Sequence, residues 1–153
     1  MLVYADSADL AAYTGVAAPA NATQLLRFAS MLVRRVTSQA FYAVDETGMP
    51  TDADVLTAFR DATCAQANAW SLNNIDPAAG VAGVGGVVVK KSLGSASVDY
   101  AVDSSVAAEQ ARLAGGGLTL EAMLILRNYG LLANNVVSDY PYNIDFAELI
   151  GDL

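Results

Sequence analysis

Residues suited to catalysis are sparse in this sequence. The 153-residue chain has no histidine and a single cysteine, Cys64. Without histidine, the chain lacks the most common general base and the most common nitrogen ligand of metals, and no Ser-His or Cys-His pair can form. A single cysteine forms no disulfide within the chain, so we expect Cys64 to be a small buried thiol.

The acidic residues with suggestive spacing have simpler explanations than catalysis or metal binding. Asp52 and Asp54 lie at the expected start of a helix, where negative side chains interact favourably with the helix dipole. The stretch DYPYNID, Asp139 to Asp145, supplies oxygen atoms but lacks the glycine and the distal glutamate of a calcium-binding loop. We therefore expect neither a catalytic acid nor a metal site.

The glycine-rich region also fails to match the nucleotide-binding motifs. In GGVVVKKS, Gly85 to Ser92, Lys90 stands where the phosphate loop G-x-x-x-x-G-K-[ST] needs its second glycine. A run of valines cannot wrap its backbone around a phosphate. The dinucleotide pattern G-x-G-x-x-G fails as well, because Val88 follows Gly83 and Gly85 at the third glycine position. No cofactor is expected.

The composition limits the classes of partner. Eight basic against sixteen acidic residues give a net charge of -8, which repels the phosphate backbone of nucleic acids. Although 54% of the residues are hydrophobic, no apolar run reaches the length of a membrane span. The N-terminal stretch MLVYADSADL has acids where a secretion signal has basic residues. We expect one soluble domain without a membrane partner.

Periodicity and capping signals predict a mainly α fold, a small bundle of four to five helices with one inserted β-hairpin and an extended C-terminal arm. The first helix is expected to begin at Asp6 or Ser7, and the last at Thr119. Thr51 with Asp54 resembles a capping box that opens the third helix. The expected helices cover Ser7 to Tyr13, Asn21 to about Phe41, Thr51 to the region before Pro77, Val106 to Leu113, and Thr119 to about Gly130.

Two of these helices have faces suited to packing on each other. Leu25, Ala29, Leu32, Val36 and Ala40 share one face of the second helix. The third helix carries the larger apolar residues Val55, Phe59, Cys64 and Trp70 and a series of alanines, whose small side chains allow close approach to the second helix. These alanines are Ala58, Ala62, Ala65 and Ala69.

Residues 87–102 are expected to form the hairpin. Val98, Tyr100 and Val102 alternate with polar or small residues, the period of a strand with one apolar face, and Gly94 supplies the turn. An isolated two-stranded ribbon is marginal in water, so we expect it to lie on the helices or to pair with another molecule.

The C-terminal segment 134–153 differs from the rest, residues 1–133, which we assign to the helical domain. It has four acids, no lysine or arginine, and nine large apolar residues without a clear period. Such a segment either folds back to close the core or acts as an arm that docks on a partner. We favour the docking arm.

Arg27, Arg34 and Arg35 form the densest basic group on one expected helix. Such charges usually face solvent. Alternatively, they contact acids of a neighbouring subunit, where charge pairs fix the register of an interface.

The order of these parts resembles the head-to-tail adaptor, or connector, proteins of tailed bacteriophages. Members of that family often carry a hairpin of the form S-x-x-G-x-x-S-V-x-Y, which is similar to Ser92, Gly94, Ser97, Val98 and Tyr100, with a Ser-to-Gly gap one residue shorter. The resemblance covers residues 1–132 by architecture, and segment 134–153 fits a portal-docking arm.

The resemblance implies a structural, non-enzymatic virion protein without cofactor. It would form a homo-oligomeric ring, commonly of twelve copies, in the neck between the portal and the stopper or next tail component. DNA would pass only as non-specific cargo, and assembly would take place in the cytoplasm of the bacterial host. The portal-docking residues would be Tyr140, Tyr142, Phe146, Leu149 and Ile150. The hairpin and subunit interface would include Lys90, Lys91, Gly94, Ser95, Ala96, Ser97 and Tyr100.

Two alternatives remain. A head-closure (stopper) or tail-terminator protein would serve the same neck, but such proteins are usually richer in strand. A small helical binding module or enzyme unrelated to phages would need a pocket of convergent acids, and the absence of histidine disfavours an enzyme.

Overall fold

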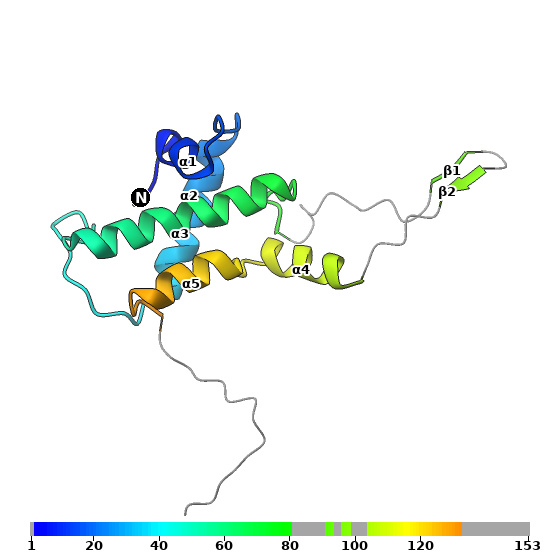
Figure 1. Cartoon of the computed structure of the whole chain (residues 1–153). Helices are drawn as coiled ribbons and strands as arrows, with labels where there is room; N and C mark the ends of the chain where they lie inside the picture. The colour runs from blue at the N-terminus through cyan, green and yellow to red at the C-terminus, as the bar shows by residue number, and fades with distance from the viewer. Residues whose placement is uncertain (1, 81–90, 94–95, 99–103, 133–153) are drawn as a thin grey trace, which may run out of the picture.

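The computed structural model describes residues 2–80, 91–93, 96–98 and 104–132, and this part of the chain is mainly helical, as predicted (Figure 1). Two three-residue strands accompany the helices. The helices are α1 (Ser7–Thr14), α2 (Ala22–Val36), α3 (Ala53–Leu72), α4 (Ser104–Ala114) and α5 (Leu120–Asn128), and the strands are β1 (Lys91–Leu93) and β2 (Ala96–Val98).

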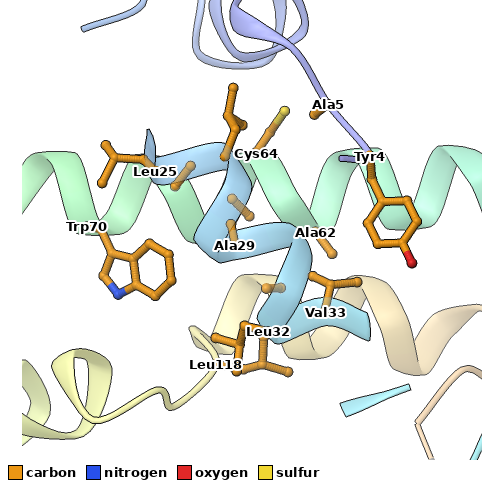
Figure 2. Close-up of a cluster of buried hydrophobic side chains, with 14 of the residues drawn as sticks. Tyr4, Ala5, Leu25, Ala29, Leu32, Val33, Ala62, Cys64, Trp70 and Leu118 are labelled. Atoms are coloured by element: carbon orange, nitrogen blue, oxygen red, sulfur yellow. The ribbon is translucent and has the colours of Figure 1, made fainter. Parts of the chain in front are cut away.

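Helix α3 is the centre of the fold. It contacts α1, α2 and α5, and α2 crosses behind it in Figure 1. Most of its circumference is buried, including Phe59 and Trp70. The alanines Ala58, Ala62 and Ala65 are fully buried, as expected for close packing, whereas Ala69 is only partly buried. Figure 2 shows Ala29 and Val33 of α2 beside this surface.

Aromatic contacts close one end of the core. The ring of Phe59 meets Tyr4 and Tyr42 edge to face, with centroids 4.9 and 5.2 Å apart. This geometry places the positive edge of one ring against the negative face of another. The backbone N–H of Tyr4 donates to the Ser30 hydroxyl at 3.0 Å, which fixes the N-terminal segment against α2.

Helix α1 begins where its sequence predicts and ends at Thr14, one residue after the predicted Tyr13. Asp6 accepts hydrogen bonds from the backbone of Ala8 and Asp9, and the Asp9 carboxylate accepts from the Asp6 N–H, which completes a capping box. At the other end, Gly15 has a φ of 73°, the left-handed conformation that glycine adopts at little cost.

Helix α2 is shorter than predicted, because it ends at Val36 rather than near Phe41. The Thr37 hydroxyl donates to the Val33 carbonyl at 2.9 Å, and a turn then brings the Ala40 N–H to the Thr37 carbonyl. Phe41 is therefore outside the helix and fully exposed, at 103% of its reference area.

Two further predictions, for the first and last residues of helix α3, are wrong. Its cap is Asp52, whose carboxylate accepts from the N–H groups of Asp54 and Val55, and not Thr51. It ends at Leu72, well before Pro77, because the Asn73 side chain donates to the Ala69 carbonyl and Asn74 turns into the left-handed region at φ 51°. Asparagine tolerates that conformation better than most residues.

Helices α4 and α5 are joined by a glycine-containing loop. Helix α4 begins two residues before the predicted Val106 and ends one residue after Leu113. Thr119 caps α5 as predicted, since its hydroxyl accepts from the Ala122 N–H at 3.1 Å.

Strands β1 and β2 pair in antiparallel register, with Lys91 opposite Val98 and Leu93 opposite Ala96. The remaining residues of the predicted hairpin 87–102 lie outside the described part of the chain, as does the predicted arm 134–153. The hairpin as a whole and the arm stay predictions.

Candidate functional site

The predicted arginine group lies on the solvent side of α2 but does not form a single patch. Arg27 and Arg34 are seven residues apart and share one stripe of the helix, because seven residues make nearly two turns. Arg35 is turned about 80° from Arg27, as 100° per residue implies. All three are exposed.

One groove lies beside the Arg27 end of this stripe. We call it the α2 groove; its volume is about 610 Å³, and its lining includes Gln24, Arg27, Phe28 and Met31. Met31 is 52% exposed and lies on α2 between Arg27 and Arg34. The stripe thus combines positive charge with accessible apolar surface, a composition found in protein interfaces.

The second groove, which we call the α2–α5 groove, contains the third arginine. Arg35 and Val36 form one wall, Met123 and Arg127 of α5 contribute to the other, and Leu118 and Leu132 add apolar surface. Its volume is about 570 Å³. The lining contains two arginines and no acid.

Acids gather at a different place, around the N-terminal ends of α1 and α5 and the middle of α3. The Tyr13 hydroxyl donates to the Glu121 carboxylate at 2.6 Å. Burial, the bond to Glu121 and the nearby charge of Asp61 raise the pKa of Tyr13, because each of them disfavours the phenolate. We call Asp6, Asp9, Asp61 and Glu121 the acidic cluster.

The buried thiol belongs to this neighbourhood. Burial, followed by the charges of Asp9 and Asp61, raises the pKa of Cys64 to about 12. The free thiol is buried, as predicted. At neutral pH it stays protonated and is a poor nucleophile, because only the thiolate reacts readily.

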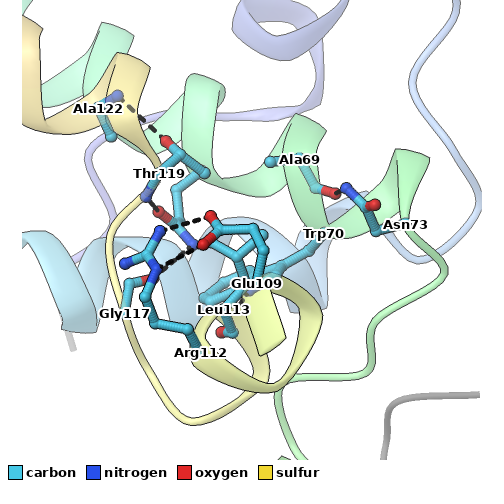
Figure 3. A network of polar contacts seen from close by, with 10 residues as sticks. Ala69, Trp70, Asn73, Glu109, Arg112, Leu113, Gly117, Thr119 and Ala122 are labelled. Carbon is cyan, nitrogen blue, oxygen red and sulfur yellow. Dashed lines mark hydrogen bonds and ion pairs between the residues drawn. The ribbon is translucent and has the colours of Figure 1, made fainter. Parts of the chain in front are cut away.

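A polar network fixes the loop between α4 and α5 (Figure 3). The Gln66 side chain accepts from the Thr119 N–H at 2.8 Å and donates to the Gly117 carbonyl at 3.3 Å. The Trp70 indole N–H donates to the Leu113 carbonyl at 3.0 Å. Sequence reasoning missed Gln66, whose only signal was its place among the buried alanines of α3.

The loop also has little spare room. A Cβ atom at Gly117 would lie 2.6 Å from an Arg112 guanidinium nitrogen and 2.8 Å from the Arg112 carbonyl oxygen. Arg112 in turn pairs with Glu109 at 2.7 Å along α4. The network therefore holds one side of the α2–α5 groove in a defined position.

The remaining predicted residues are only partly placed. Lys91, Ala96 and Ser97 lie on β1 and β2, whereas Lys90, Gly94, Ser95 and Tyr100 lie outside the described residues. The five predicted portal-docking residues, Tyr140 to Ile150, lie outside them too.

The described residues contain no group of three or more histidine, cysteine, aspartate or glutamate residues placed to hold a metal ion. In the same part of the chain, no helix combines the length and apolar character needed to cross a lipid bilayer.

Comparison with known protein families, curated protein sequences and solved structures found no match to this chain.

Proposed function

We propose that this chain is a structural adaptor that assembles into a ring in the neck of a tailed bacteriophage, between the portal and the stopper or next tail component. The observation that carries the proposal is the separation of charge over the helical domain. Arg27 and Arg34 lie on α2, whereas the acidic cluster is built from the N-terminal ends of α1 and α5 and the middle of α3.

Such an arrangement suits a ring. Head-to-tail subunits use two different surfaces, each repeated in every copy, and the contacts close when the rotation between copies completes a circle. Opposite charges on the two surfaces attract neighbours and penalise contacts between like surfaces. The accessible side chains of Met31 and Phe41 add apolar area on the α2 side.

The helical character of the described residues supports an adaptor over a head-closure or tail-terminator protein, for which more strand is expected. The net charge of -8 suits a channel that passes DNA without binding it. In this proposal, segment 134–153 docks on the portal through Tyr140, Tyr142, Phe146, Leu149 and Ile150, and the hairpin 87–102 contacts the neighbouring subunit or the next ring. The assembled protein belongs to the virion neck.

The proposal is tested by imaging the purified full chain, alone and with a candidate portal, by negative-stain electron microscopy. Rings or portal-capped particles are the expected result. Inert monomers that bind no portal would contradict it, and hydrolytic turnover by such monomers would favour an enzyme instead.

Charge reversal tests the surfaces. Arg27→Glu with Arg34→Glu should weaken self-association at least about tenfold, because like charges would then face each other. Adding Asp61→Arg and Glu121→Arg to the same chain should restore association. The matched control, Arg35→Glu with Arg127→Glu, makes the same change in net charge in the α2–α5 groove, outside the Arg27–Arg34 stripe and the acidic cluster, and should retain association. Equal loss in both double variants would contradict the assigned surfaces.

A further inference from the structure

The α2–α5 groove has a charge that nothing in the described part of the chain neutralises. Arg35 and Arg127 line it, and neither forms an ion pair within the described residues. The Arg35 guanidinium extends over the loop, since a Cβ atom at Gly116 would lie 3.9 Å from one of its nitrogens. In a chain with twice as many acids as bases, two neighbouring arginines without an acidic partner mark a place where an anionic group is favoured.

The groove is also apolar enough to bind a peptide. Val36, Met123 and Leu132 are partly buried, and Leu118 is almost completely buried. The volume of about 570 Å³ is in the range of pockets that enclose small ligands or a few side chains. The loop wall is fixed by Gln66 and Thr119, so the groove is formed before an occupant arrives.

The position of Leu132 indicates the occupant. Leu132 lines the groove itself and is the last described residue, so the chain continues from the groove edge into 133–153. That segment contains four acids, no basic residue and the apolar residues that a groove of this composition accepts.

We propose that the α2–α5 groove binds the chain's own segment 133–153, with Asp or Glu side chains of the segment on Arg35 and Arg127 and its apolar residues on Val36, Leu118 and Met123. The tether favours this occupant over competitors. A segment joined directly to its binding groove has an effective concentration of the order of millimolar, well above that of a free partner in dilute solution.

The inference does not require the phage assignment, because it depends only on the groove and on the sequence that follows it. If this inference and the phage assignment both hold, the groove keeps the segment on the body of its own subunit until a portal competes for it. Failure of portal binding would leave this inference intact, and failure of this inference would leave portal binding to be tested independently.

The test uses the full chain with the photoreactive amino acid p-benzoylphenylalanine in place of Met123. Isotope-labelled and unlabelled chains are mixed in equal amounts and irradiated at low protein concentration, and the crosslinked peptides are identified by mass spectrometry. The expected result is crosslinks from position 123 to 133–153 of the same chain, without mixed-label pairs. The control places the same amino acid at Thr23, which is exposed on α2 outside this groove, and should give no such crosslink.

Charge reversal is the second part of the test. Arg35→Glu with Arg127→Glu should lower the crosslink yield roughly three- to tenfold, as expected for two exposed charge pairs converted to like charges. Arg60→Glu should change it by less than about twofold, because Arg60 lies outside the groove. Mixed-label crosslinks would assign the groove to a second copy, and crosslinks outside 133–153 would assign it to another segment. Either result, or equal loss with Arg60→Glu, would overturn the proposal.

Discussion

At the scale of single residues, the structure buries some polar side chains and leaves others exposed to solvent. Cys64 and Gln66 are buried in the same turn of α3 but have different roles: the thiol fills space, and the amide bonds to a loop. Arg34 and Arg35 are exposed neighbours that face different surfaces.

Cys64 should react slowly with a thiol reagent in the folded protein. Its pKa of about 12, against an ordinary value of 9.0, corresponds to a roughly 1,000-fold smaller thiolate fraction near pH 8. We expect Ellman's reagent to label the native chain at least about 100-fold more slowly than the chain unfolded in urea. Comparable rates in the two states would show that Cys64 is accessible.

The raised pKa of Cys64 also affects the stability of the folded protein. Folding favours the neutral thiol, so its contribution to the free energy of unfolding is complete below pH 9 and is lost as the pH rises towards 12. Replacement by alanine should therefore make the alkaline loss of stability shallower, as measured by urea unfolding at several pH values.

Gln66 should be one of the polar residues most important for stability. Gln66→Leu removes both bonds and leaves the buried Thr119 N–H without an acceptor, which should lower the free energy of unfolding by about 2–3 kcal/mol. Gln39→Leu, at an exposed position, should change it by less than about 0.5 kcal/mol. Urea unfolding followed by circular dichroism measures both, and equal effects would contradict the role of the network.

At the scale of elements, the helix boundaries follow hydrogen bonds that the sequence only partly specifies. Periodicity and capping predicted four to five helices, and the described residues contain five; the cap of α5 was predicted correctly, and that of α1 is Asp6, one of the two residues offered. The end of α2 could not be predicted, because the apolar pattern continues through Ala40. In the structure the helix ends at Val36, and the hydrogen bonds of Thr37 lead into a turn. Thr51 and Asp52 are both acceptable caps, and only the backbone geometry decides between them.

The choice of cap is directly testable. Asp52→Ala should destabilise the protein by about 1 kcal/mol, because two N–H groups at the start of α3 lose their acceptor. Thr51→Ala should cost less than about 0.5 kcal/mol, since the Thr51 hydroxyl makes only a 3.4 Å contact with the Ala43 carbonyl. Thermal unfolding of the two variants distinguishes them, and the reverse order would favour the cap predicted from sequence.

At the scale of the whole molecule, the candidate surfaces depend on how α2, α3 and α5 pack together. The sequence placed the three arginines on one helix, but it could not show that Arg35 would share a groove with Arg127, more than ninety residues away. Nor could it show that acids from α1, α3 and α5 would gather around Tyr13 and Cys64. Both depend on long-range packing, which local periodicity does not encode.

If the charged surfaces drive association, salt should weaken it. The Debye length falls from about 10 Å at 0.1 M to about 3 Å at 1 M ionic strength, so attraction between exposed arginines and acids is screened. We expect the apparent dissociation constant of self-association, measured by sedimentation velocity, to rise about tenfold over this range. Association that strengthens with salt would indicate that apolar contacts around Phe41 and Met31 dominate instead.

The indole bond at the junction of α3 and α4 has a practical consequence. Trp70 is the only tryptophan of the chain, and its N–H donates to the Leu113 carbonyl next to the loop that Gln66 holds. Intrinsic fluorescence therefore reports on one known location, and a red shift of the emission would signal water entering between these two helices. The protein carries its own optical probe, so movement of α4 can be followed in real time without any attached dye.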